Sequence, residues 1–219
     1  WIMQGKVRVD GQVITKAGTH VALDLSLEVD SYEPPYVSRA GFKLEKALAD
    51  FGIAVAGYTV LDAGLSTGGF TDCLLQQGAR KIYGVDVGYG QAHEKIRADE
   101  RVVVMERTNL RELRTVGELV DMVTLDLSFI SILKVIEAVH SLLKPGGILV
   151  TLIKPQFEAG RHDVGKGGIV KDPAVHERVI DEITRGVCQQ GFVYKGCIPS
   201  PILGTTGNKE FLAYFIRND

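Results

Sequence analysis

Ionisable side chains follow four apolar segments of this sequence, each at the point where the segment ends. They are Asp62, Asp86, Asp126 and Lys154, and the segments before them end at residues 61, 85, 125 and 153. If these segments are parallel strands of one sheet, their carboxyl ends meet at one edge, where ligands of open α/β sheets bind. Carboxylates at that edge can orient a polar ligand or accept a proton, and a lysine can stabilise negative charge.

A glycine-rich turn follows the first of these segments, in the stretch TVLDAGLSTGGF of residues 59–70. Glycines let the backbone approach a ligand closely, and the free N–H groups of the next helix are donors for polar ligand groups. A dinucleotide site prefers G-x-G-x-x-G, whereas the order here is D-x-G-x-x-x-G-G. That order resembles the first motif of S-adenosylmethionine-dependent methyltransferases. The cofactor-binding residues predicted in this stretch are Asp62, Gly64, Ser66, Thr67, Gly68 and Gly69.

The second strand strengthens the prediction of a nucleoside cofactor. Asp86 ends it, a little over twenty residues after Gly64, and a carboxylate at this place can accept hydrogen bonds from both ribose hydroxyls. Asn109, after the third predicted strand, and Asp126, after the fourth, complete the predicted cofactor set. Alternatively, Asp86 is a solvated turn residue or a helix cap and binds no ligand.

Composition limits the class of protein. The chain has 219 residues, of which 45% are hydrophobic and 24% charged, which suits one globular domain with a small appendage. No apolar run reaches the roughly 20 residues of a membrane helix. Three cysteines without a C-x-x-C pair suggest a reducing, cytoplasmic setting, and the five histidines have no metal-binding spacing. The net charge of −2 counts mildly against avid nucleic-acid binding. The start resembles no signal peptide and lacks an initiating Met, so we expect the natural protein to begin earlier.

Strands alternate with helices from residue 36 onward, which predicts a doubly wound, mostly parallel, seven-stranded α/β sheet of Rossmann-like type. Helices are expected over residues 39–51, 92–98, 130–143 and 175–190, and strands near residues 59–62, 81–86, 102–105, 122–126, 148–153, 192–194 and 211–216. Ser38 is a candidate cap for the first helix, and Gly52 a candidate stop. Before this region, Asp10-Gly11 predicts a hairpin, with further strand over residues 20–23 and 25–29.

Four motifs resemble the haemolysin A, or TlyA, group of methyltransferases related to the FtsJ type. They are SRAGFKLEKAL with Lys43, LDLSFIS with Asp126, LIKPQFE with Lys154 and GNKEFL with Glu210. The resemblance implies a catalytic tetrad of these four residues, S-adenosylmethionine as cofactor, no metal, and methylation of a ribose 2′-hydroxyl in ribosomal RNA of a ribosomal subunit. IMQGKVRVDGQV is similar to the second half of the same family's RNA-binding domain, of the kind found in small-subunit ribosomal protein S-four. We therefore expect a partial RNA-binding module and linker start over residues 1–33, and the methyltransferase domain over residues 34–219.

The residues leave several alternatives open. Lys154 could act as a neutral base, or as an ammonium that stabilises the developing alkoxide. The near-neutral charge also fits a small-molecule methyltransferase. A non-catalytic RNA-binding or lytic protein that keeps the cofactor fold is the third possibility. The tetrad and Asp86 together favour the enzyme.

Overall fold

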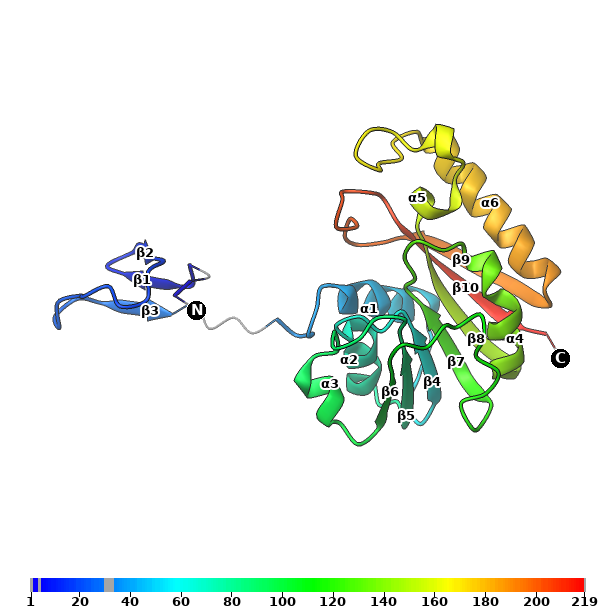
Figure 1. The fold of residues 1–219 in the computed structure, drawn as a ribbon, viewed down its shortest axis with the longest axis horizontal. Helices are drawn as coiled ribbons and strands as arrows, with labels where there is room; N and C mark the ends of the chain where they lie inside the picture. Colours follow the sequence, from blue (N-terminus) through cyan, green and yellow to red (C-terminus); the bar gives the residue numbers. More distant parts are fainter. Residues whose placement is uncertain (1, 4, 30–33, 219) are drawn as a thin grey trace. The chain divides into compact units, whose positions relative to one another are not determined.

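The computed structural model describes residues 2–3, 5–29 and 34–218 of the chain (Figure 1). Backbone contacts divide the protein into two compact units, residues 1–35 and residues 36–219. Each unit has its own sheet. Residues 30–33, where the predicted linker starts, lie outside the described residues.

The N-terminal unit is a small antiparallel sheet in the order β2-β1-β3, formed by β1 (Val7–Val9), β2 (Gln12–Ile14) and β3 (Leu27–Val29). Asp10 and Gly11 connect the first two strands with φ angles of 44° and 76°, the backbone that a two-residue hairpin turn requires. The predicted hairpin is therefore confirmed. The predicted strand over residues 20–23 is not formed, and the third strand begins only at Leu27.

The larger unit contains the predicted seven-stranded sheet, in the order β6-β5-β4-β7-β8-β10-β9. Only β10 runs antiparallel to its neighbours, β8 and β9. In chain order the strands are β4 (Thr59–Ala63), β5 (Lys81–Val85), β6 (Val102–Met105), β7 (Val120–Leu125), β8 (Leu143–Ile153), β9 (Phe192–Pro199) and β10 (Phe211–Arg217). The predicted fold class is therefore confirmed.

Alternating side chains of the strands build a hydrophobic core on each face of this sheet. Val60 and Met122 pack with α1 (Ala40–Phe51), α2 (Gly69–Gln76) and α3 (Glu94–Ala98). Their chain neighbours Leu61 and Val123 pack with α4 (Ile136–Leu142) and α6 (Pro173–Gln189) on the opposite face. Helices thus cover both faces (Figure 1), and both faces of the central strands are apolar. The short elements are η1 (Ile132–Lys134), α5 (Pro155–Glu158) and η2 (Arg161–Asp163).

Two local predictions need correction. The helix expected over residues 130–143 is divided into η1 and α4, and Leu143 already belongs to β8, where it pairs with Val120. Ser38 does not cap α1, because Arg39 occupies the N-cap position and no side chain makes a cap hydrogen bond. Gly52 ends the helix as predicted, in the left-handed conformation.

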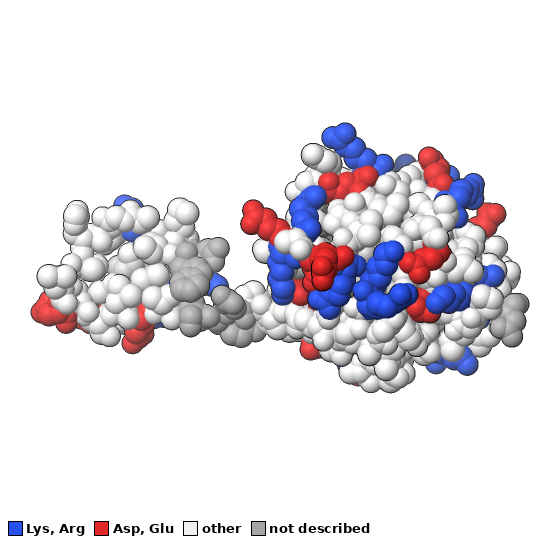
Figure 2. Space-filling model, turned by 90° about the horizontal axis from the view of Figure 1, so that it is seen from below, with Lys and Arg blue, Asp and Glu red and all other residues white. Residues whose placement is uncertain are grey.

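Charges of both signs lie side by side on the face of the larger unit that Figure 2 displays, in keeping with the small net charge. Within the described ranges, no helix is long and apolar enough to cross a membrane.

Candidate active site

Two cavities open at the carboxyl ends of the parallel strands. The lysine cavity, named for Lys43 and Lys154 in its wall, has a volume of about 300 Å³. The Asp86 cavity has a volume of about 340 Å³ and is lined by Asp86 and the residues that follow β6 and β7. The residues that line both cavities are Gly64, Ser66, Asp126 and Ser128. A molecule in one cavity therefore lies beside a molecule in the other.

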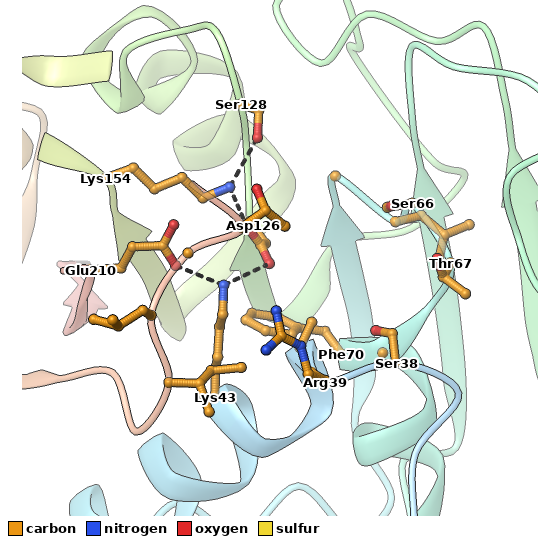
Figure 3. Close-up of a pocket in the computed structure, with 18 residues that line it drawn as sticks. Ser38, Arg39, Lys43, Ser66, Thr67, Phe70, Asp126, Ser128, Lys154 and Glu210 are labelled. Atoms are coloured by element: carbon orange, nitrogen blue, oxygen red, sulfur yellow. Dashed lines mark hydrogen bonds and ion pairs between the residues drawn. The ribbon is translucent and has the colours of Figure 1, made fainter. Parts of the chain in front are cut away.

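The four residues of the predicted tetrad form one chain of ion pairs in the lysine cavity (Figure 3). Lys154 Nζ lies 2.6 Å from Asp126 Oδ1, and Lys43 Nζ lies 2.7 Å from Glu210 Oε2. Lys43 Nζ is also 4.0 Å from Asp126 Oδ2, which joins the two pairs. Both lysines are 8% exposed and Glu210 is 4% exposed. The structure thus brings together residues that lie up to 167 positions apart in the chain.

Different elements supply each member of this tetrad. Lys43 projects from α1, next to the fully buried Leu44. Asp126 directly follows β7, and its N–H donates to the Ala63 carbonyl of the neighbouring strand. Because Phe211 of the antiparallel β10 pairs with Ile153 at the end of β8, Glu210 reaches the same edge of the sheet as Lys154.

The charges of the tetrad balance, with two cations and two carboxylates. Ion pairing favours the charged form of a lysine, and burial strengthens the interaction of an ammonium with nearby negative charge. Such an ammonium can stabilise an oxyanion that forms within hydrogen-bond distance.

Ser128 is a site residue that the sequence interpretation missed. Its Oγ accepts a hydrogen bond of 3.0 Å from Lys154 Nζ (Figure 3). It lies in the quoted motif LDLSFIS, two residues after Asp126. In an extended segment, side chains two positions apart point the same way, and this period could have identified it. Ser38 and Arg39, also unpredicted, line the lysine cavity as well.

Asp86 occupies the place at the end of β5 from which a carboxylate can hold a ribose. Its oxygens accept hydrogen bonds from the backbone N–H groups of Ser66 (2.8 Å) and Gly88 (2.7 Å). A carboxylate has about four lone-pair sites, so acceptor capacity remains for two ribose hydroxyls. Apolar side chains form much of the cavity wall, namely Val85, Val87, Leu110, Leu127, Phe129, Ile130 and Val135. Asn109 also lines it. A carboxylate beside an apolar wall fits an adenosine.

The glycine turn provides the space between the two cavities. A Cβ on Gly64 would lie 2.4 Å from the Asp126 carbonyl oxygen, and the φ angle of Gly64 is +85°. Only glycine therefore fits between β4 and the residue after β7. Ser66, Thr67 and Gly69 line the lysine cavity, and Ser66 also lines the Asp86 cavity; that they bind a cofactor stays a prediction.

Two predicted cofactor residues lie away from both cavity walls. Asp62 is 1% exposed, and its oxygens accept hydrogen bonds from the hydroxyls of Thr71 (2.7 Å) and Thr124 (2.8 Å). Burial raises the pKa of Asp62 to about 6, against the opposing effect of these two hydrogen bonds. A Cβ on Gly68 would lie 2.7 Å from Ile96 of α3. Direct contact with a cofactor is therefore not supported for either residue. Asp62 instead connects β4 to α2 and β7 through its hydrogen bonds, and Gly68 lets the turn pack closely against α3.

A family model, related sequences and a solved structure match this chain over most of its length. The family model of FtsJ-like methyltransferases matches residues 36–217, nearly the whole larger unit. YqxC of Bacillus subtilis, a candidate rRNA methyltransferase, is 47% identical over 217 residues, which cover 97% of the chain and 77% of that protein. The 16S/23S rRNA (cytidine-2′-O)-methyltransferase TlyA of Mycobacterium tuberculosis is 45% identical over 214 residues, covering 96% of the chain and 80% of that protein. The solved structure of a hemolysin candidate from Streptococcus thermophilus matches with a TM-score of 0.84 and 41% identity, covering all of the chain and 81% of that protein.

Proposed function

The chain belongs to the FtsJ-like methyltransferase family, within its TlyA and haemolysin A group, and from this premise we propose that it methylates a ribose 2′-hydroxyl of ribosomal RNA. The methyl donor in this proposal is S-adenosylmethionine. It supplies an activated methyl group on a sulfonium, whose sulfur keeps the electron pair of the bond that breaks.

The Asp86 cavity would hold the adenosine of the donor. Asp86 would accept hydrogen bonds from its ribose hydroxyls, and the apolar residues around Leu110 and Leu127 would pack against the adenine. The turn of Gly64 and Ser66 lies on the boundary with the lysine cavity. The methionine part would therefore lie along this turn and point toward the tetrad.

The lysine cavity would hold the ribose that receives the methyl group. A ribose hydroxyl is a poor nucleophile and must lose its proton as its oxygen forms the new bond. We assign the Lys154 ammonium to stabilise the negative charge that develops on this oxygen. Asp126, the carboxylate that borders both cavities, is assigned to accept the proton. Lys43 and Glu210 hold Asp126 in place through the second ion pair.

One observation carries this proposal: the tetrad lines the lysine cavity, and its member Asp126 also lines the adjoining Asp86 cavity. Methyl transfer is an in-line displacement, so donor and acceptor must approach from opposite sides of the methyl carbon. Two adjacent cavities with charged groups at their junction meet this requirement.

Ribosomal RNA is the acceptor best supported by relatives. The similar protein of M. tuberculosis is named as a 16S/23S rRNA (cytidine-2′-O)-methyltransferase, and that of Campylobacter jejuni as a 23S rRNA (cytidine-2′-O)-methyltransferase. We infer that this chain also modifies a cytidine. In the same proposal residues 1–33 are part of an RNA-binding module and residues 34–219 carry the reaction.

The test is transfer of a radiolabelled methyl group from S-adenosylmethionine to purified ribosomal subunits, with small-molecule acceptors in parallel. Ribose methylation should then be mapped on ribosomal RNA from cells with and without the protein. We expect label at a ribose 2′-oxygen of a cytidine and no label with the inactive variant Asp126→Asn. Label on a base or only on a small molecule would overturn the proposal, as would cofactor binding without any transfer.

A further inference from the structure

We propose that Ser128 is a positioning residue for methyl transfer: it fixes the direction of the Lys154 ammonium, while Glu158 fixes the loop that carries Ser128. This inference rests on the proposed function, because it assigns Lys154 to the attacking oxygen.

The first step concerns the hydrogens of Lys154. An ammonium has three N–H donors. The contacts of Lys154 in the described structure account for two, one to Asp126 Oδ1 (2.6 Å) and one to Ser128 Oγ (3.0 Å). With two acceptors fixed, rotation about the last side-chain bond is restricted and the third N–H has one direction. Without Ser128, the ammonium could rotate around its single ion pair.

The second step concerns the loop of residues 127–131, which carries Ser128. At its start, the Asp126 N–H donates to the Ala63 carbonyl. At its end, the Ile132 N–H donates to Glu158 Oε1 at 2.9 Å. Between these points Phe129 has a φ angle of +65°, an uncommon conformation for a bulky residue that its surroundings must maintain.

The third step shows why Glu158 acts on Ser128 and Lys154 together. Glu158 ends α5, the short helix that begins directly after Lys154. The Phe157 N–H donates to the Lys154 carbonyl, and the Phe157 ring contacts Phe129 with 4.9 Å between ring centres. The loop is therefore fastened to the segment that also carries Lys154. A shift of Glu158 would move Ser128 relative to the ammonium.

The experiment compares Ser128→Ala with Ser128→Thr, and uses Ser141→Ala, a serine on α4 outside both cavities, as the matched control. Loss of a hydrogen bond to a charged group corresponds to about a 10- to 150-fold effect on the rate. We expect Ser128→Ala to lower kcat by about this factor, with donor affinity and RNA KM within about twofold of wild type. Ser128→Thr should stay within about threefold of wild type, because it keeps the hydroxyl.

A double-mutant cycle tests the role of Glu158. Glu158→Ala as a single change should lower kcat. Combining it with Ser128→Ala should lower kcat little further, because both changes release the same contact. Additive losses would show that Glu158 does not act through Ser128. An unchanged kcat in Ser128→Ala, or an equal loss in Ser128→Thr, would refute the role of Ser128.

A measurement without RNA separates this inference from the proposed function. The side-chain ammonium signal of Lys154 can be observed by ¹⁵N NMR and assigned by its loss in Lys154→Arg. We expect its hydrogens to exchange with water several-fold faster in Ser128→Ala than in wild type or Ser141→Ala. If the wild type methylates nothing but exchange is still faster in Ser128→Ala, the proposed function fails while the contact between Ser128 and Lys154 is supported. Equal exchange in all three proteins would overturn the inference even in an active enzyme.

Discussion

Replacement of Lys154 by alanine is the most direct test of the proposed site. The change removes the ammonium that lies 2.6 Å from Asp126 and 3.0 Å from Ser128. It also changes the formal charge of the tetrad from zero to −1, because both carboxylates and only one lysine remain. Negative charge developing on the ribose oxygen would then form beside a cluster of the same sign.

The structure sets the size of the expected effect. Removal of one group that stabilises a developing oxyanion typically costs about 10²–10³-fold in kcat, which corresponds to about 3–4 kcal/mol in the barrier. Lys154 lines the lysine cavity but not the Asp86 cavity. We therefore expect Lys154→Ala to lose this factor in kcat while donor affinity stays within about threefold of wild type.

The assay is methyl transfer to ribosomal subunits, with donor affinity measured by calorimetry. Lys144→Ala is the matched control, because Lys144 also pairs with an aspartate, at 2.5 Å from Asp121, but lines neither cavity. This control should keep full activity. Lys154→Arg keeps the charge, but its planar group does not fit a buried contact made by a compact ammonium. We expect it to remain at least about tenfold below wild type.

Two outcomes would refute this reasoning. If Lys154→Ala methylates nearly as fast as wild type, Lys154 does not act on the reacting oxygen and the proposed site is wrong at its centre. If Lys154→Arg alone is nearly as active as wild type, only the positive charge is needed and the positional role fails.

Three further predictions concern the cofactor, stability and RNA. Asp86→Ala should weaken S-adenosylmethionine binding about 10- to 100-fold through the loss of charged hydrogen bonds, with an unchanged circular dichroism spectrum; calorimetry showing wild-type affinity would remove Asp86 from the site. The pKa of Asp62 is about 6 in the fold and 3.8 as its ordinary value, so the native state binds the proton more tightly than the unfolded state does. Lowering the pH from 7 to 5 should therefore stabilise wild type by about 1 kcal/mol relative to Asp62→Asn. Urea unfolding of both proteins at both pH values measures this, and the assignment is contradicted if wild type gains no stability relative to Asp62→Asn. Binding to ribosomal RNA should weaken as the salt concentration rises, because phosphate contacts release counterions. It should strengthen in a version extended by the N-terminal helices of the family's RNA-binding domain. An affinity that changes in neither comparison argues against an RNA-binding role for residues 1–33.

The elements of the fold were largely predictable, because their signals are local. The Asp10-Gly11 hairpin, the glycine turn after β4 and the end of α1 at Gly52 each depend on the backbone preferences of one or two residues. The alternation of strands and helices predicted the doubly wound sheet. Boundaries were less certain: η1 and α4 replace one expected helix, and α4 ends at Leu142 because Leu143 already pairs in the sheet.

The residues of the site likewise divide into those with a local signal in the sequence and those without one. The place of Asp86 directly after β5 could be predicted from the sequence, because one strand and one turn determine it. Lys43 and Glu210 carry no such signal: they lie 167 positions apart, and only resemblance to a family connected them. The contact between Ser128 and Lys154 was also beyond local interpretation, since it depends on how the loop after β7 meets the end of β8.

The sequence by itself therefore determined the types and order of the elements, and the edge of the sheet at which the ionisable residues gather. Only the tertiary structure decided which of these residues touch. β10 lies antiparallel between β8 and β9, and this brings Glu210 beside the end of β8. β4 continues to Ala63, so Asp62 lies within the strand and points to Thr71 and Thr124 instead of a cavity. Side-chain direction changes with every residue of a strand, so a shift of one position at a strand end decides between a ligand contact and a buried support.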